Sequence, residues 1–134
     1  MTTPQIGKLR QVRLFSGLDN DALERIASLA TEFEAPKGQV LIERGQAGTG
    51  VFIIEEGAVR IDLPDGTHLE RGEGSFFGEL AVLADAPRAA RVIVSEPLRA
   101  LAIRRDDLLD LLEREPALAV GMLRELARRF TDPA

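Results

Sequence analysis

The spacing of apolar residues along the chain changes twice, and each change marks a border between two kinds of secondary structure. In residues 1–30, apolar side chains recur every three or four positions, which is helical spacing. From residue 31 to 103, apolar and polar side chains alternate, so each strand buries one face. Helical spacing returns from residue 104. The pattern therefore predicts a mainly β domain with helices at both ends.

Two helical stretches are expected before residue 31. The first carries an apolar stripe that is interrupted near Ser16–Gly17: Ile6, Leu9, Val12 and Leu14. The second begins at about Asp19 or Asn20 and ends before Pro36. Asp21, with Glu24 three residues later, fits the capping box that satisfies free N–H groups at a helix start.

Short strands separated by glycine- and proline-containing turns fill the middle of the chain. Seven segments are expected: Thr31–Ala35, Gln39–Ile42, Val51–Glu55, Ala58–Leu63, Thr67–Glu70, Arg91–Val94 and Leu98–Ile103. Many short strands with regularly spaced turns favour a sandwich, roll or barrel.

Two further helices follow the strands. Asp106–Glu113 is leucine-rich, and Asp106 and Asp107 favour its start through the helix dipole. Pro116 ends this helix and suits the first turn of the next one. The last helix carries an apolar stripe: Val120, Leu123, Leu126, Ala127 and Phe130.

Composition indicates one soluble domain and excludes several kinds of site. The chain has 134 residues, of which 45% are apolar and 29% charged. It has no cysteine, which excludes disulfides and thiolate sites, and its only histidine, His68, is expected on a strand surface. No apolar run is long enough to span a bilayer, and no secretory signal is visible. A cytoplasmic location is expected, with the cytosolic domain of a membrane protein as the alternative.

Charge argues against sequence-independent nucleic-acid binding, which needs basic surface to neutralise phosphates. Seventeen basic and 22 acidic residues give a net charge of −5. Two basic pairs, Arg104–Arg105 and Arg128–Arg129, lie in acidic helical surroundings, and we expect solvated helix faces there.

One segment, residues 77–90, breaks the strand pattern with a short helix-prone run at Glu79–Ala84. Gly78 before it lets the backbone approach a ligand closely, and the first helical turn has free N–H groups. Arg88 provides a planar fork of donors suited to phosphate oxygens. Glu79 can accept a hydrogen bond from a sugar hydroxyl, with its charge offset by Arg88. The same residues also fit a plain structural Arg–Glu pair.

The segment from Phe77 to Ala90, FGELAVLADAPRAA, resembles the phosphate-binding cassette of the cyclic nucleotide-binding domain family. This family includes catabolite-activator-type regulators, regulatory subunits of cyclic-nucleotide-dependent kinases and cyclic-nucleotide-gated channels. The resemblance extends over about residues 9–130 and includes these further matches: Leu14–Leu18, Gly45, Val51–Ile54 and Gly57–Val59. Gln46 and Arg91 depart from the family pattern.

The resemblance implies an eight-stranded antiparallel β-roll, or jelly roll, with N-terminal helices, a short cassette helix and two C-terminal helices. It implies that Arg88 pairs with the cyclic phosphate and that Glu79 holds the ribose 2′-hydroxyl. Main-chain groups complete the cradle at Gly78, Leu80, Ala81, Ala89 and Ala90. Ala89 leans towards cyclic AMP over cyclic GMP. Arg129 is a candidate to lie over the base, with a solvated helix arginine as the alternative.

We therefore expect a single cyclic nucleotide-binding domain over residues 1–134. Its parts are a helical segment (1–30), a β-roll (31–103) with the cassette at 77–91, and C-terminal helices (104–134). The expected function is a sensor that catalyses nothing, needs no metal or cofactor, and moves its C-terminal helices on binding. By itself it is expected to bind neither nucleic acid nor membrane. An effector domain in a longer parent protein is a possible partner.

Two alternatives stay open. The first is a degenerate copy that keeps the fold as an interaction module without a ligand; intact Glu79 and Arg88 argue against it. The second is a metal-dependent jelly-roll enzyme of the cupin type. Such a site needs a histidine cluster, which one histidine does not provide.

Overall fold

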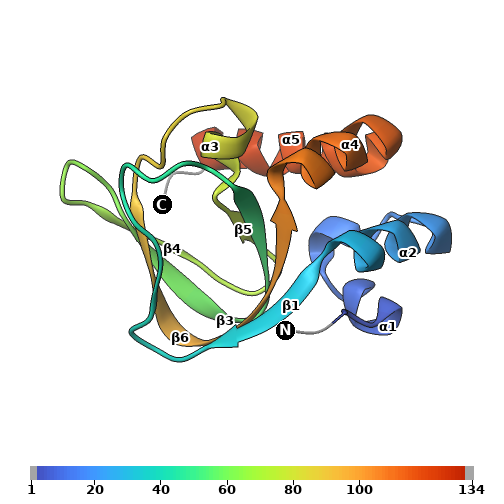
Figure 1. The fold of residues 1–134 in the computed structure, drawn as a ribbon, viewed down its shortest axis with the longest axis horizontal. Helices are drawn as coiled ribbons and strands as arrows, with labels where there is room; N and C mark the ends of the chain where they lie inside the picture. The colour runs from blue at the N-terminus through green and yellow to red at the C-terminus, as the bar shows by residue number, and fades with distance from the viewer. Residues whose placement is uncertain (1–2, 132–134) are drawn as a thin grey trace.

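Six antiparallel strands form one curled sheet, and the longer helices lie to one side of it (Figure 1). The computed structural model describes residues 3–131. The elements are α1 (Ile6–Leu9), the 3₁₀ turn η1 (Arg13–Phe15), α2 (Asn20–Leu29), β1 (Thr31–Ala35), β2 (Val40–Ile42), β3 (Gly50–Asp62), β4 (His68–Arg71), β5 (Phe76–Phe77), α3 (Glu79–Leu83), β6 (Arg91–Arg104), α4 (Arg105–Arg114) and α5 (Pro116–Thr131).

The long strands β3 and β6 organise the sheet. They pair from Gly50 opposite Arg104 to Asp62 opposite Arg91. β1 and β2 add to β6, while β4 and β5 add to β3. The mainly antiparallel fold with flanking helices is therefore as expected.

The structure of residues 3–131 has six strands instead of the expected eight. Two pairs of the seven expected segments are continuous, and β5 was not among the expected segments. Val51–Glu55 and Ala58–Leu63 both lie in β3, and the two segments expected after residue 91 both lie in β6. Where a break was expected in β3, the register of β3 against β6 shifts between residues 54 and 59, but the strand continues without a turn. Gly57 has a φ of +92°, and a Cβ there would lie 2.1 Å from the Pro97 carbonyl oxygen. The glycine therefore marks a bulge that bends a strand instead of ending it.

The start of α2 differs from the expected capping box. Asp19 is the cap: its side chain accepts a hydrogen bond from the Ala22 N–H at 2.9 Å. Its backbone is extended, with φ −80° and ψ 175°, as a cap requires. Asp21 lies inside the first turn, so the expectation that it caps the helix was wrong.

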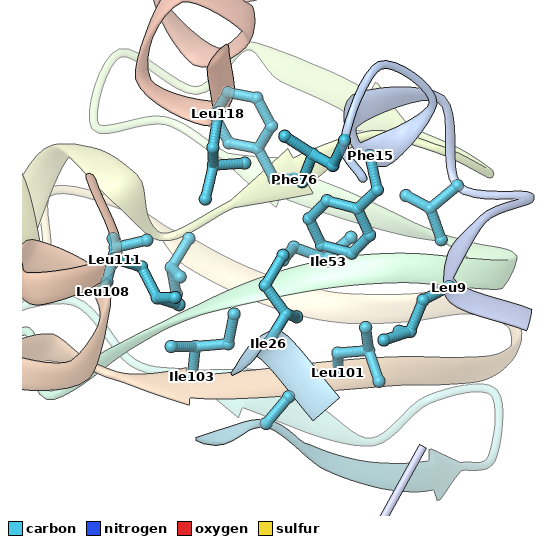
Figure 2. Packing of buried hydrophobic residues seen from close by; sticks show 14 of the residues in the cluster. Leu9, Phe15, Ile26, Ile53, Phe76, Leu101, Ile103, Leu108, Leu111 and Leu118 are labelled. Carbon is cyan, nitrogen blue, oxygen red and sulfur yellow. The ribbon is translucent and has the colours of Figure 1, made fainter. Parts of the chain in front are cut away.

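Two apolar clusters lie on opposite faces of the sheet. One joins the sheet to α1, η1, α2, α4 and α5, and Figure 2 shows Leu9, Phe15, Ile26, Ile53, Phe76 and Leu118 within it. The other lies inside the roll and includes Ile54, Val59 and Phe77. Consecutive strand residues point to opposite faces, so Phe76 and Phe77 anchor β5 in both clusters. This fixes the backbone immediately before Gly78.

The last helix packs through a different face from the expected stripe. Leu118 and Met122, four residues apart, are buried, and Leu126 is partly buried. Val120, Leu123 and Phe130 are exposed at 44%, 64% and 88%. The expected stripe therefore combined residues from two helix faces. Pro116 begins α5, and Asp106 and Asp107 lie in the first turn of α4, both as expected.

The surface position expected for His68 is found. His68 is exposed on β4, and its Nδ1 lies 2.8 Å from Asp62 Oδ1. Within residues 3–131, every helix is too short or too polar to cross a membrane.

Glu32 on β1 and Glu55 on β3 form a carboxyl pair on the helix-covered side of the sheet. Both Glu32 and Ile53 lie opposite Leu101, which places Glu32, Ile53 and Glu55 on one face. Burial, then the hydrogen bond and negative charge of Glu32, raise the pKa of Glu55 to about 7, opposed by Lys8 and Arg99. Such a pair is stable when one proton is shared between the two carboxyls.

Glu55→Gln is therefore expected to change how stability depends on pH. A folded-state pKa raised from 4.5 to about 7 means that the stabilising proton is fully bound below pH 4.5 and lost as pH rises through 7. This group lowers the wild-type free energy of unfolding over that interval by less than about 3 kcal/mol, because solvent screens a half-buried pair. Urea unfolding from pH 4 to 8 measures it. Glu56→Gln, at the exposed neighbouring position, is the control; parallel curves for wild type and Glu55→Gln would contradict the assignment.

Candidate functional site

A cavity of about 300 Å³ opens between the cassette, the β3–β4 hairpin and α5. All eight residues singled out from the sequence line it: Gly78, Glu79, Leu80, Ala81, Arg88, Ala89, Ala90 and Arg129. A larger groove of about 510 Å³ between η1 and α5 contains none of them. The smaller cavity is therefore the candidate site, because all the residues expected to bind a ligand line it.

Arg88 lies at the cassette end of this cavity, and two main-chain carbonyls hold its guanidinium. Its Nη1 donates to the Gly78 carbonyl oxygen at 2.6 Å, and its Nη2 donates to the Gly50 carbonyl oxygen at 2.7 Å. The residue is only 7% exposed. Burial lowers the pKa of Arg88, and the charge of Glu79 raises it. Arginine still remains protonated at neutral pH, so the cavity holds a fixed, partly desolvated cation.

Gly78 makes this position of Arg88 possible. Its φ of +85° is in the left-handed region that side chains disfavour, and a Cβ there would lie 2.8 Å from Arg88 Nη1. The carbonyl of Gly78 then points at the guanidinium, and the chain enters α3 at Glu79. Conformation and close approach thus both require glycine.

The loop after α3 is fastened by the segment at residues 45–46. The Arg88 N–H donates to the Gln46 carbonyl oxygen at 2.7 Å, and the Gly45 N–H donates to the Arg88 carbonyl oxygen at 2.8 Å. Gly48 packs against α3, since a Cβ there would lie 2.5 Å from that of Ala81. The departure at Gln46 therefore leaves this backbone pairing intact.

Glu79 is buried at 5% exposure, and its partner is Arg129 on α5. Arg129 Nη1 donates to Glu79 Oε1 at 2.5 Å, and its Nη2 donates to the Phe76 carbonyl oxygen at 2.7 Å and to Ser75 Oγ at 3.2 Å. The guanidinium carbon also lies 4.5 Å from the centre of the Phe76 ring. Arg129 is thus not on a solvated helix face, and Arg129, rather than Arg88, forms the ion pair with Glu79.

Arg71 on β4 is a cavity residue that the sequence analysis did not single out. It lies opposite Val59 in the sheet, so its side chain is on the face that points into the roll. The available sequence signal was the spacing of Leu69 and Arg71, because residues two apart in a strand lie on the same face. Burial and then the charge of Arg129 lower the pKa of Arg71, and Glu79 and Glu125 raise it.

The remaining walls are apolar or small. Ile61, Leu63 and Leu69 line the hairpin side, and exposed Leu80 and Phe130 lie at the rim. Arg91 points away and pairs with Glu43 at 3.2 Å. Among residues 3–131, no histidine, cysteine, aspartate and glutamate side chains gather in a group that could hold a metal ion. The cavity suits a small molecule with one anionic group, a hydroxyl and an apolar body.

The sequence model of the cyclic nucleotide-binding domain matches residues 32–115. The chain belongs to this family. It is 37% identical over 112 residues to a protein of Rhodopseudomonas palustris named as a potassium channel, covering 81% of this chain and 27% of that protein. It is 38% identical over 85 residues to the cAMP-dependent protein kinase regulatory subunit of Yarrowia lipolytica, covering 63% of this chain and 22% of the subunit.

Among solved structures, a point mutant of the cAMP-binding acyltransferase from Mycobacterium smegmatis superposes with a TM-score of 0.82 and 30% identity. The superposition covers 94% of this chain and 40% of that one. The chain spans about a quarter of the length of each of the two curated relatives named above.

Proposed function

We propose that this domain binds a cyclic nucleotide in the cavity, prefers cyclic AMP to cyclic GMP, and transmits binding to its C-terminal helices. It acts as a regulatory module and catalyses no reaction. The observation that carries the proposal is the buried guanidinium of Arg88, held by the Gly50 and Gly78 carbonyls. Relatives named for cyclic AMP support the choice of ligand.

The cyclic phosphate would bind at Arg88. Its two carbonyl bonds occupy two N–H groups, whereas a guanidinium has five, so donors remain for phosphate oxygens. The carbonyls also orient the fork before a ligand arrives, which reduces the entropy lost on binding. Ala89 and Ala90 place little bulk beside their amides, which would complete the cradle.

The ribose would bind at Glu79. Oε1 of Glu79 already accepts from Arg129, whereas Oε2 has no hydrogen-bond donor among residues 3–131. Oε2 is therefore available to the 2′-hydroxyl. One carboxylate would then join the ligand to α5 through Arg129.

This shared carboxylate is the proposed route from the ligand to the C-terminal helices. A ligand shifts such an equilibrium only by its different affinity for the two arrangements. A 2′-hydroxyl on Glu79 favours the arrangement in which Arg129 is also held there, with α5 packed over the base. The preference for cyclic AMP rests on Ala89, which offers no hydroxyl to a guanine base. The effector is a proposed further part of a longer protein.

Arg88→Ala should weaken binding of cyclic AMP by about 10- to 100-fold, because a hydrogen bond to a charged group contributes about 1.5–3 kcal/mol. Isothermal titration calorimetry measures the dissociation constant. Arg88→Lys keeps the charge without the fork and should give intermediate binding. Arg91→Ala, an exposed arginine nearby, is the control. Equal constants for all three variants and wild type would reject the role of Arg88; absence of binding by wild type at millimolar ligand would favour the ligand-free interaction module.

Cyclic AMP should slow amide hydrogen exchange in the last turns of α5, whereas 2′-deoxy cyclic AMP should slow it much less. The reason is that only the first ligand has the hydroxyl for Glu79. Arg129→Ala should remove the difference between the two ligands, and Arg128→Ala, on the adjacent exposed position, should keep it. Identical exchange with both saturating ligands in the wild type would remove Glu79 and Arg129 from the coupling.

A further inference from the structure

The groove of about 510 Å³ between η1 and α5 shares no lining residue with the cavity. On α5, Arg124 and Arg128 line the groove, whereas Arg129 and Phe130 line the cavity. The groove residues of α5 run from position 116 to position 128, which is about 18 Å of helix. The groove is therefore an elongated hollow that the proposed nucleotide site does not use.

The walls of this groove provide apolar surface. Leu14 and Leu18 line one side and Val120 the other, while Gly17 leaves room between them. Val120 is 44% exposed, and Leu123, its neighbour one turn along α5, is 64% exposed. Apolar surface that stays in water beside a hollow gives a partner free energy when the partner covers it.

The charged residues of the groove are three arginines and one glutamate. Glu125 accepts from Arg13 Nη2 at 3.3 Å and from Arg128 Nη2 at 2.9 Å. Arg124 is exposed and forms no ion pair or hydrogen bond within residues 3–131. The groove therefore carries an excess of two positive charges, in a chain whose net charge is −5. This local excess selects for a partner that brings negative charge to the groove.

The size and charge of the groove favour an acidic peptide segment over other anions. A long polyanion, such as a nucleic acid or an anionic membrane, would also meet the rest of a chain with net charge −5, which would repel it. A short segment with a few carboxylates would contact the arginines alone, and carboxylates match the guanidinium fork. Three turns of an amphipathic helix have the length of the groove, and such helices commonly bind in apolar grooves.

We propose that the groove between η1 and α5 docks an acidic amphipathic helix of a partner protein. Its carboxylates pair with Arg13 on one wall and Arg124 on the other, and its apolar face covers Leu14 and Val120. Exposed ion pairs contribute little free energy, so the apolar contacts supply most of the affinity and the arginines select the partner. This interaction goes beyond the proposed function and does not depend on nucleotide binding.

The test is selection of a displayed library of random 12-residue peptides on the wild-type domain, followed by fluorescence polarisation with the enriched peptides. These should combine acidic and apolar residues, and their binding should weaken as NaCl rises from about 50 to 500 mM. Arg13→Glu/Arg124→Glu should weaken binding by about 10-fold or more, because attraction becomes repulsion. The matched control, Arg44→Glu/Arg104→Glu, changes the charge equally at exposed positions outside the groove and should bind like wild type.

Circular dichroism checks that each variant folds, and Arg13→Gln/Arg124→Gln, which introduces no repulsion, should still weaken binding by about threefold or more. Several results would overturn the proposal: no enriched peptide, enriched peptides without acidic residues, or equal binding to wild type and both groove variants. A 12-nucleotide DNA strand or phosphatidylserine vesicles that bound the groove more tightly than the peptides would also overturn it. None of these results bears on nucleotide binding at Arg88, so the two proposals fail separately.

Discussion

The site depends on the position of one guanidinium. Arg88 is buried, and burial of a cation is costly unless its donors are satisfied. The carbonyls of Gly50 and Gly78 satisfy two of them, and these residues belong to β3 and to the turn after β5. The sheet therefore positions the cation: β3 is paired along its length with β6, and β5 is fixed by Phe76 and Phe77. A ligand meets an arginine whose orientation is already set.

Glu79 is the point where this rigid part meets the helices. Its two oxygens have different environments, since one accepts from Arg129 and the other has no donor among the described residues. Arg129 also contacts the Phe76 ring and the Phe76 carbonyl, so α5 is attached to β5 as well as to the cassette. Any ligand that contacts Glu79 therefore binds the same carboxylate that holds Arg129, the residue that anchors α5.

The sequence was sufficient to predict the cassette and its family, because the FGELAVLADAPRAA run carries several specific residues at fixed spacing. It also predicted the helices and most strand positions. It did not predict the strand count, since Gly57 is compatible with either a turn or a bulge until its neighbour Pro97 is placed. It did not predict the Glu79–Arg129 pair, because fifty residues separate the two and helical periodicity does not say which face packs. Arg71 was missed for a different reason: its two-residue spacing from Leu69 indicates a shared face, but only the pairing of β4 with β3 shows that this face points into the roll.

The most direct test of the central claim is a crystal structure of the domain with cyclic AMP bound. The account predicts that the cyclic phosphate oxygens lie within hydrogen-bond distance of the Arg88 guanidinium, with the Gly50 and Gly78 carbonyls still in contact with it. A nucleotide bound elsewhere on the surface, with protein side chains filling the hollow beside Arg88, would contradict it.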